Sequence, residues 1–363
     1  MAVNRHTVAI NTGGGDCPGL NAVIRSVVKR ATVQLDWKVI GIKDSFDGIL
    51  GSRIDVIELD RDTVAGALTK GGTILGSTNR GNPFNFDKEH SGQGKDLSTL
   101  VSERLATFNC EGLIALGGDG TMSICHQLSQ KTGLKIVGVP KTIDNDLKGT
   151  DITFGFNSAV EFATQAVDRL HSTAESHHRI MVVEVMGRDA GFIALHAGVG
   201  GGADAILIPE VPFDLQVVAA KVLDRQSFGR YFSIVVVAEG ARENDKNPIY
   251  DSLVGSGSEH LGGIGRYVAE KLHEMTGIDA RYTVLGHLQR GGVPTAFDRI
   301  LATRLGNHAV ELVERGEWGR LVVMRNNHIT SIPLEEAVDG TRQVSMDCDL
   351  VHAARGLGIV FGD

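Results

Sequence analysis

The stretch GLIALGGDGT at residues 112–121 decides the fold class, because its apolar run passes directly into three glycines and an aspartate. A short Leu- and Ile-rich run that ends in glycine is typical of a strand buried in a parallel sheet. The stretch TVAINTGGG at residues 7–15 repeats the pattern. In open α/β sheets, ligands bind at the carboxyl ends of the strands. Both stretches therefore predict binding loops of an α/β protein.

Further strand candidates recur along the chain, at residues 38–43, 134–139, 180–186, 204–208, 233–238 and 282–285. Helix candidates alternate with them: apolar residues repeat at helical spacing over 97–108, and Asp214 is placed to cap a helix over 215–223. This alternation predicts mainly parallel sheets covered by helices on both faces. The polar stretch 80–96 is expected to form a long loop near the binding edge.

Length and composition exclude several classes of protein. A chain of 363 residues exceeds one ordinary core, so two domains or one large α/β unit are expected. Forty-six glycines with only eight prolines do not fit a collagen-like or proline-rich disordered chain. The net charge of −8 argues against binding to a nucleic-acid backbone. No signal peptide and no apolar run of about 18 residues is found, so a cytoplasmic protein is expected.

The four cysteines, Cys17, Cys110, Cys125 and Cys348, lie far apart and show no metal-binding spacing. Reduced structural thiols are the favoured interpretation. A reactive Cys17 beside the glycine loop is the alternative, although no neighbour in the sequence would lower its pKa.

The motif GGDGT at residues 117–121 follows a predicted strand. Small residues there let backbone N–H groups approach phosphate oxygens, the start of the next helix adds positive potential, and Asp119 can hold Mg²⁺. A tight turn without a ligand is the alternative. The same motif occurs in NAD kinases and lipid kinases, so it indicates a phosphoryl donor in general.

The motif PKTIDND at residues 140–146 places Asp144 and Asp146 directly after another predicted strand. Phosphoryl transfer to an alcohol needs a carboxylate that accepts the hydroxyl proton and groups that position the metal, and the two aspartates can divide these tasks. An acidic turn that caps the next helix is the alternative.

Cationic side chains follow or precede several of the predicted strands: Arg179, Arg188, Arg281, His287 and Arg290. Gathered at one binding edge they would suit a phosphorylated acceptor, because arginine binds phosphate with two parallel hydrogen bonds. Taken singly, each fits a surface residue or an ion-pair partner. Glu239 ends a predicted strand and is a candidate acceptor for sugar hydroxyls, with a helix-capping charge as the alternative.

Five motifs together resemble the 6-phosphofructokinase family. They are TGGGDCPGLN at 12–21, GGDGT at 117–121, PKTIDND at 140–146, VEVMGR at 183–188 and LGHLQRGG at 285–292. They occur in the order of the family and cover roughly residues 6–305. The sequence is most similar to the long, ATP-type members of the phosphofructokinase A group, which includes enzymes with different phosphoryl donors.

The resemblance implies two similar three-layer α/β/α domains with mainly parallel sheets and an active-site cleft between them. Residues 1–155 with about 289–339 would bind the nucleotide, and residues 156–288 with about 340–363 would bind fructose 6-phosphate. The implied reaction phosphorylates the 1-hydroxyl of fructose 6-phosphate with MgATP, a committed step of glycolysis.

The resemblance also assigns roles to single residues. Asp144 would take the proton from the 1-hydroxyl, Arg188 would stabilise the transferring phosphoryl group, and Thr142 would contact the sugar phosphate. Asp119 and Asp146 would hold the magnesium ion. The implied nucleotide contacts are Gly14, Arg80, Gly81, Gly118, Asp119, Gly120 and Thr121. The implied fructose 6-phosphate contacts are Thr142, Ile143, Asp144, Arg179, Met186, Gly187, Arg188, Glu239, Arg281, His287, Leu288, Gln289 and Arg290.

The resemblance further implies an obligate homo-oligomer, expected to be a tetramer. In the family, the positions of Arg179 and Arg281 reach the active site of a neighbouring subunit. The family is often allosteric, but the effector pocket of its bacterial members is only partly matched here. Basic side chains are kept at Arg25, Lys29 and Arg53, whereas His171, Phe228 and Phe232 stand where basic or polar residues are usual.

Two positions bear on the phosphoryl donor. Pyrophosphate-dependent members carry Asp at the position of Gly120 and Lys at the position of Lys141. Glycine at 120 leaves room for the α-phosphate of a nucleotide and so predicts ATP, while Lys141 fits either donor. Asn79 stands where a nucleotide-contacting arginine is usual, and Arg80 is expected to replace it.

Three other functions stay open as alternatives. The first is a phosphofructokinase that uses pyrophosphate or ADP. The second is a sugar-phosphate-binding regulatory subunit without catalysis, which would be expected to have lost Asp119, Asp144 or Arg188. The third is a dinucleotide-dependent dehydrogenase, which the absence of a GxGxxG motif after the first strand opposes.

Overall fold

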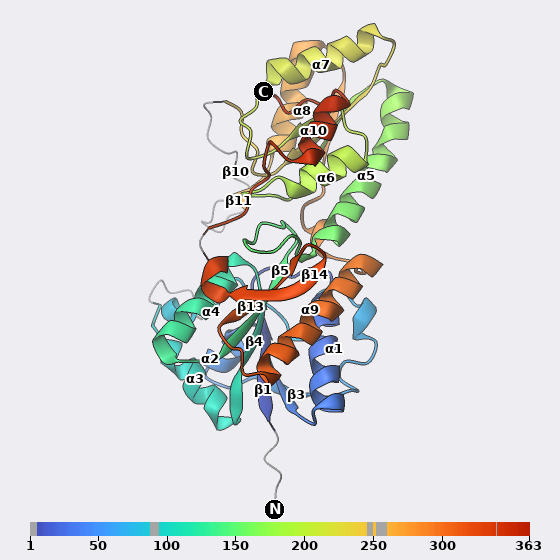
Figure 1. The fold of residues 1–363 in the computed structure, drawn as a ribbon. Helices are drawn as coiled ribbons and strands as arrows, with labels where there is room; N and C mark the ends of the chain where they lie inside the picture. The colour runs from blue at the N-terminus through green and yellow to red at the C-terminus, as the bar shows by residue number, and fades with distance from the viewer. Residues whose placement is uncertain (1–5, 88–93, 245–249, 252–259, 339) are drawn as a thin grey trace, which may run out of the picture. The chain divides into compact units, whose positions relative to one another are not determined.

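A computed structural model describes residues 6–87, 94–244, 250–251, 260–338 and 340–363 (Figure 1). The chain divides into two compact units. The first unit contains residues 1–143, 147–157 and 290–341, and the second contains residues 144–146, 158–289 and 342–363. The predicted domains change at nearby positions, except that residues 144–146 belong to the second unit. The binding role predicted for each domain stays a prediction.

The first unit is built on an eight-stranded sheet. Its order is β14 (His328–Pro333), β13 (Arg320–Arg325), β5 (Ile136–Thr142), β4 (Cys110–Gly117), β1 (Thr7–Thr12), β2 (Lys38–Ile42) and β3 (Val56–Leu59), with β6 (Phe154–Gly155) paired to the end of β5. The edge strands β3 and β14 run antiparallel to their neighbours, and the inner pairs run parallel. The strands β1, β4 and β5 are buried almost throughout, as their continuous apolar runs predict.

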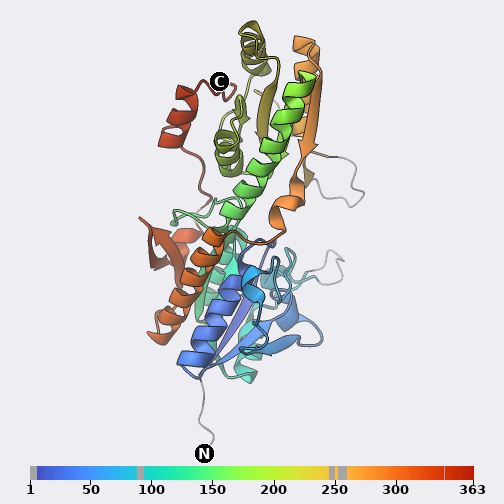
Figure 2. The same cartoon turned by 90° about the vertical axis from the view of Figure 1, so that its right-hand side faces the viewer.

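Helices cover both faces of this sheet. On one face α1 (Leu20–Lys29), which continues as a π-helical turn at Arg30–Gln34, lies beside α9 (Ala296–Glu314), seen as the blue and orange helices of Figures 1 and 2. On the other face lie α2 (Asp47–Leu50), α3 (Ser98–Thr107) and α4 (Asp119–Thr132), which bury one apolar core against β1, β4 and β5. Short 3₁₀ turns occur at Ala67–Thr69, Pro83–Asn85 and Leu334–Ala337.

The strand order of the first unit reverses at β1. The chain passes from β1 through α1 to β2 on one side, whereas β4 lies on the other side of β1 and is followed by α4 on the opposite face. Open α/β sheets bind ligands at such a switch point, outside the carboxyl ends of the two strands. The glycine loops after β1 and β4 flank it, as the sequence predicts.

The second unit is built on a four-stranded parallel sheet. Its order is β12 (Ala280–Val284), β7 (Ile180–Val185), β9 (Ser233–Ala238) and β8 (Ala205–Leu207). On one face α7 (Leu215–Ser227) and α8 (Ile264–Thr276) bury an apolar core against the strands. On the other face α6 (Phe192–Gly200) contacts β8 and β9, with α5 (Phe156–His177) packed beside it. The unit is completed by α10 (Asp349–Gly356), the 3₁₀ segment Gly286–Arg290 and the short strands β10 (Tyr250–Asp251) and β11 (His260–Leu261).

The three-layer α/β class and the predicted strands are confirmed. Asp214 caps α7 as expected, since its side chain accepts a hydrogen bond from the backbone N–H of Gln216 at 2.8 Å. The predicted loop over 80–96 includes residues 88–93, which lie outside the described residues. Through the described ranges, every helix is too short or too polar to cross a lipid bilayer.

Candidate active site

The glycine loop after β1 is held close to the neighbouring strand. The backbone N–H of Gly13 donates to the carbonyl oxygen of Leu116 at 2.8 Å. A Cβ on Gly13 would lie 2.7 Å from Oγ1 of Thr121, so only glycine fits against the start of α4. Gly14 has a φ of +78°, a conformation that glycine adopts without strain. The sequence of the loop is therefore dictated by close approach to its neighbours.

Ser77 braces the same loop, although sequence reasoning did not single it out. Its hydroxyl donates to the carbonyl oxygens of Gly14 at 2.5 Å and Thr12 at 3.1 Å. The side chain of the adjacent Asn79 also approaches the loop, because its Oδ1 lies 3.9 Å from where a Cβ on Gly14 would be. The signal in the sequence that could have pointed to Ser77 is its position in the stretch GSTN at residues 76–79.

The first turn of α4 presents an open anion-binding surface. Gly118 occupies the N-cap position, and Asp119 and Gly120 are exposed, while Thr121 is buried. Apart from its chain neighbours and the nearby backbone of its own helix, no heavy atom of the described residues lies within 4 Å of where a Cβ on Gly120 would be. The unpaired N–H groups at a helix start attract phosphate. The space over Gly120 is therefore available to a donor phosphate.

Lys141 brings a buried cation to the glycine loop. The residue is 4% exposed at the end of β5, and its Nζ lies 3.1 Å from where a Cβ on Gly14 would be. Arg290 approaches the same loop, since its Nη1 donates to the carbonyl oxygen of Asp16 at 3.2 Å. The first unit therefore places positive charge beside the glycines that follow β1.

Arg80 and Gly81 differ in their surroundings. Arg80 is exposed, whereas Gly81 is buried, and a Cβ on Gly81 would meet the carboxyl group of Asp47. Gly81 is thus required by packing against the start of α2. The predicted nucleotide contact of both residues stays a prediction.

The motif PKTIDND is divided between the two units. Thr142 ends β5 and Ile143 follows it, both buried in the first unit, whereas residues 144–146 belong to the second. In the second unit Asp144 is half-buried and Asp146 is buried. Asn145 between them has a φ of +56°, in the left-handed region. Sequence reasoning did not anticipate this division.

At the carboxyl end of β7, Met186 is buried and Gly187 turns the chain with a φ of +141°. A Cβ on Gly187 would lie 2.7 Å from the carbonyl oxygen of Ala190, so the turn requires glycine. The turn leaves Arg188 exposed. The arginine expected to act on the transferring phosphoryl group therefore stands at the edge of the sheet.

Glu239 lies beside this turn, at the end of the neighbouring strand β9. Its backbone N–H donates to the carbonyl oxygen of Val185 at 2.8 Å. Burial raises the pKa of the Glu239 carboxyl to about 7, the nearby Asp144 carboxylate adds to the rise, and Arg188 opposes it. Asp144 and Arg188 thus both lie within electrostatic reach of Glu239 in the second unit.

His287, Leu288 and Gln289 follow β12, whose carboxyl end lies at the same edge as that of β7. His287 is exposed, Leu288 is 64% exposed and Gln289 is 1% exposed. Their position after a strand end is the one that the sequence predicts, and their contact with substrate stays a prediction.

Arg179 and Arg281 do not join this group. Arg179 precedes β7 and Arg281 is the second residue of β12, so both lie at the amino end of the parallel strands. Nε of Arg179 pairs with Asp279 at 2.7 Å, and Arg281 pairs with the same aspartate. A strand of six residues spans about 20 Å at ~3.3 Å per residue. The two arginines therefore lie at the amino ends of the strands, whereas Arg188 lies beyond their carboxyl ends.

A magnesium ion would fit the donor set at α4. In the part of the chain that the structure describes, no three His, Cys, Asp or Glu side chains gather into a metal site. Magnesium at phosphoryl-transfer sites usually takes one or two carboxylates, with substrate phosphates and water as its other ligands. The exposed carboxylate of Asp119 beside the helix start suits this arrangement.

The thiol of Cys17 is not placed to react. All four cysteines are free thiols. Cys17 is fully buried, and burial raises the pKa of its thiol to about 12. A thiol with so high a pKa stays protonated at neutral pH, which excludes the reactive alternative for Cys17.

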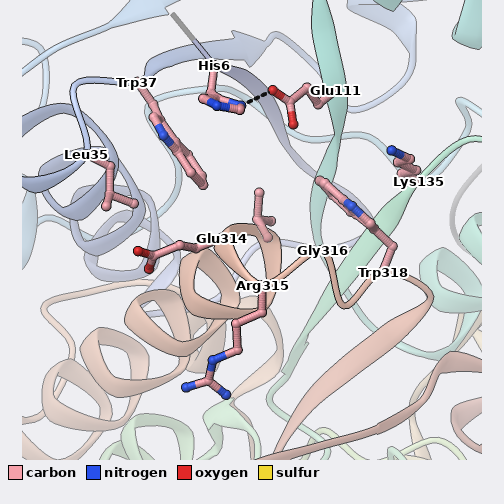
Figure 3. Close-up of a pocket in the computed structure, with 10 residues that line it drawn as sticks. His6, Leu35, Trp37, Glu111, Lys135, Glu314, Arg315, Gly316 and Trp318 are labelled. Carbon is pink, nitrogen blue, oxygen red and sulfur yellow. Dashed lines mark hydrogen bonds and ion pairs between the residues drawn. The ribbon is translucent and has the colours of Figure 1, made fainter.

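A pocket of about 530 Å³ lies in the first unit, at the amino edge of the sheet (Figure 3). It is lined by His6, Leu35, Trp37, Glu111, Lys135, Val313, Glu314, Arg315, Gly316 and Trp318. Trp37 directly precedes β2 and Trp318 lies just before β13. The pocket is therefore at the opposite edge from the glycine loops, and the residues predicted for the active site do not line it.

Comparison with known proteins identifies the family. The family model described as phosphofructokinase matches residues 7–313, which is most of the chain. The chain belongs to the phosphofructokinase family. A curated relative of Chloroflexus aggregans, named ATP-dependent 6-phosphofructokinase, is 49% identical over 100% of this chain and 99% of its own.

Other phosphofructokinases are similar too. A relative of Streptomyces coelicolor, named pyrophosphate–fructose 6-phosphate 1-phosphotransferase, is 48% identical over 98% of this chain and 99% of its own. The crystal structure of Pichia pastoris phosphofructokinase in the T-state superposes with a TM-score of 0.80 at 33% identity, over 93% of this chain and 36% of that one. The chain described here therefore covers about a third of the length of the Pichia pastoris chain. Relatives named for ATP and for pyrophosphate are almost equally similar to this chain. Overall sequence identity therefore does not indicate which phosphoryl donor is used.

Proposed function

We propose that this chain transfers the γ-phosphoryl group of MgATP to the 1-hydroxyl of fructose 6-phosphate, giving fructose 1,6-bisphosphate in glycolysis. The observation that carries the proposal is that Asp144 and Arg188 both act electrostatically on Glu239 within the second unit. The three side chains supply a base, a cation and a hydroxyl acceptor, which a phosphoryl transfer to a sugar requires. The curated relatives named ATP-dependent 6-phosphofructokinase support the same reaction.

In the proposed mechanism each side chain has one task. Asp144 accepts the proton of the 1-hydroxyl as that oxygen attacks the γ-phosphorus. Arg188 stabilises the charge of the transferring group, and Glu239 accepts hydrogen bonds from sugar hydroxyls. The proposed contacts of fructose 6-phosphate also include Thr142, Ile143, Met186, Gly187, His287, Leu288, Gln289 and Arg290.

The proposed donor site is the switch point of the first unit. Gly14, Arg80, Gly81 and residues 118–121 would contact the nucleotide, and Lys141 places its cation beside the loop. Asp119 would hold magnesium, with assistance from Asp146, and the bound ion would neutralise charge on the donor phosphates. The carboxylate of Asp119 also gives negative charge to the surface that the ion would occupy.

ATP is the donor that the open space over Gly120 favours, because the additional phosphate and nucleoside need room there. Pyrophosphate is the second candidate, supported by the buried cation of Lys141 and by the Streptomyces coelicolor relative. ADP is the third.

A coupled assay for fructose 1,6-bisphosphate tests the proposal, with fructose 6-phosphate and ATP, ADP or pyrophosphate compared at equal concentration. ATP is expected to give the highest kcat/KM. Faster turnover with pyrophosphate would overturn the donor, and no product with any donor would overturn the reaction. Omission of magnesium should abolish turnover, and Asp144→Asn protein serves as the control with strongly reduced turnover.

We also propose a cytoplasmic homotetramer in which Arg179 and Arg281 contact the substrate of a neighbouring subunit. Their position at the opposite sheet edge from Arg188 supports this, since one chain does not bring them to its own group. Allosteric control is part of the proposal, although the effector pocket of the bacterial family members is only partly matched by this chain. His171 approaches the carbonyl oxygen of Gly201 at 2.6 Å and the ring of Phe232, so the side chain is held within its own unit.

A further inference from the structure

Arg342 holds two successive carbonyl groups of the loop at residues 144–146. Its backbone N–H donates to the carbonyl oxygen of Asp146 at 2.6 Å, and its Nε donates to the carbonyl oxygen of Asn145 at 3.2 Å. Both contacts lie within the second unit. Nearly 200 residues separate Arg342 from this loop in the sequence, so the contacts exist only in the folded chain.

The loop needs such support because of its backbone. Asn145 has a φ of +56°, in the left-handed region, which asparagine adopts more readily than most residues but less readily than glycine. Hydrogen bonds from a guanidinium to buried carbonyl oxygens are charge-assisted and are stronger than neutral ones. The contact at Asn145 therefore offsets the strain at the residue that directly follows Asp144.

Arg342 also contacts the other side of the predicted catalytic group. Its Cζ lies 4.6 Å from the centre of the Phe192 ring, a cation–π distance. Phe192 begins α6, directly after the loop that carries Gly187 and Arg188. A single guanidinium thus links the loop of Asp144 to the helix that follows the loop of Arg188.

The next two residues, Gln343 and Val344, help to hold the loop that carries Arg188. Nε2 of Gln343 donates to the carbonyl oxygen of Asp189 at 3.3 Å. The backbone N–H of Val344 donates to Oε1 of Glu210 at 2.8 Å, and Glu210 also accepts the N–H of Gly191. The segment 342–344 therefore runs along both loops, with Arg342 as its contact to the loop of Asp144.

We propose that Arg342 is a positioning residue that fixes the carboxylate of Asp144 relative to Arg188. This inference rests on the proposed role of Asp144 as the base. The guanidinium is essential to it, because its Nε donates to the carbonyl oxygen of Asn145 while its Cζ lies over the Phe192 ring. Lysine has no donor at the position of Nε and no planar face, so it cannot make both contacts.

The test compares Arg342→Met and Arg342→Lys with the wild-type chain. Both variants keep the backbone hydrogen bond to Asp146 and much of the aliphatic packing. We expect kcat to fall about tenfold or more in both, with KM for fructose 6-phosphate changed less than about threefold, because a base displaced by ~1 Å loses rate rather than binding. Unchanged kcat in both variants would overturn the proposal.

A double substitution separates positioning from general structural damage. In an Asp144→Asn background, Arg342→Met should lower kcat by less than about twofold, since the group that Arg342 positions is already gone. A full additional tenfold loss would show that Arg342 acts on something else and would overturn the proposal.

The matched control is Arg355→Met. Arg355 also stacks its guanidinium on an aromatic ring of the second unit, at 5.3 Å from the centre of Phe361, and pairs with Asp363. Its kcat should stay near that of the wild type. If the wild-type chain itself makes no fructose 1,6-bisphosphate, the proposed reaction fails. If it is active, Asp144→Asn has strongly reduced turnover and the Arg342 variants are unaffected, only the positioning role fails.

Discussion

The side chain of Lys141 donates a hydrogen bond from Nζ to the carbonyl oxygen of Gly15 at 2.5 Å. The contact reaches from the end of β5 to the loop after β1, past the intervening strand β4. It places a buried ammonium beside the backbone of a loop that Ser77 and Arg290 also hold. A phosphate bound at this loop would lie near the charge of Lys141.

Replacement of this lysine should weaken donor binding. In Lys141→Met protein the charge-assisted hydrogen bond is lost, which is worth about 1.5–3 kcal/mol. We expect KM for the donor to rise about tenfold, with less than about a twofold change in KM for fructose 6-phosphate. Steady-state kinetics with each substrate varied in turn measure both constants. Lys135→Met is the control, because Lys135 is exposed at the amino edge of the same sheet. Equal donor KM in wild type and variant would contradict the role.

A carboxylate at position 120 should reduce the use of ATP. Because the Cβ of Gly120→Asp enters open space, the fold should be kept while the new charge repels the donor phosphates. We expect kcat/KM for ATP to fall about tenfold or more, with an unchanged melting temperature. Gly356→Asp adds the same charge at another unhindered glycine, at the end of α10, and should leave the kinetics alone. Unaltered ATP kinetics in Gly120→Asp protein would remove the steric argument for the donor.

Asp144→Asn should separate catalysis from binding. An amide keeps the size of the side chain but cannot accept the hydroxyl proton, and a general base contributes about 10²–10⁴-fold to rate. We expect a loss of kcat in this range with little change in KM for fructose 6-phosphate, measured with the coupled assay. Equal losses in kcat and in binding would instead indicate that the loop had collapsed.

Glu239 should give a pH dependence near neutrality. Because the pKa of its carboxyl is raised from 4.5 to about 7 in the folded chain, ionisation favours unfolding, and stability falls as pH rises through this interval. In Glu239→Gln protein the side chain at position 239 cannot ionise. Its melting temperature relative to wild type should therefore be higher at about pH 8 than at about pH 5.

The same residue should control the pH profile of the reaction. The wild-type kcat/KM for fructose 6-phosphate should rise through an apparent pKa near 7, as Glu239 becomes the carboxylate that accepts sugar hydroxyls. Glu239→Gln protein should lose this step. The apparent pKa belongs to the pair with Asp144, since their charges interact. An identical midpoint in the variant would assign the titration to another group.

Arg281 should act across a subunit boundary. Asp144→Asn and Arg281→Ala proteins are expected to be weak or inactive alone, but a hybrid oligomer contains sites in which Asp144 of one subunit meets Arg281 of the other. Co-expression of the two variants with different affinity tags should therefore restore activity, up to about half of the sites in each hybrid. Hybrids as inactive as the parents would place Arg281 at the site of its own chain. The mass of the purified hybrid, by light scattering, gives the oligomeric state.

Much of the fold could be predicted because its central strands are buried on both faces and end in glycine. The strand β3 escaped prediction since Ile57 and Glu58 are exposed at the sheet edge, which leaves no apolar run. The strand β14 is a similar edge strand with alternating burial. The apolar run of β13 was readable, but no glycine loop follows it.

The candidate site was predictable where a motif reports close approach of the backbone, as at Gly13, Gly14 and Gly187. Arg342 could not be found in this way. It contacts the carbonyl oxygens of Asn145 and Asp146, and almost any sequence offers those groups. The division of PKTIDND between two units is also invisible in the sequence, because it depends on which residues the following chain packs against.

The strand order of the first unit has a consequence for synthesis on the ribosome. β13 pairs with β5, and α9 packs on α1, so segments near the end of the chain complete a unit whose first strand is made at the start. Until residues 290–341 emerge, the open edge of β5 is available to other chains, as any unpaired strand edge is. Folding of the second unit is also completed late, since the carbonyl oxygen of Val360 accepts a hydrogen bond from the backbone N–H of Ile206 in β8. The first unit therefore cannot finish folding before β13 has been made, nor the second before Val360 has been made, and chaperone protection of the nascent chain matters most between the exposure of β5 and the arrival of β13.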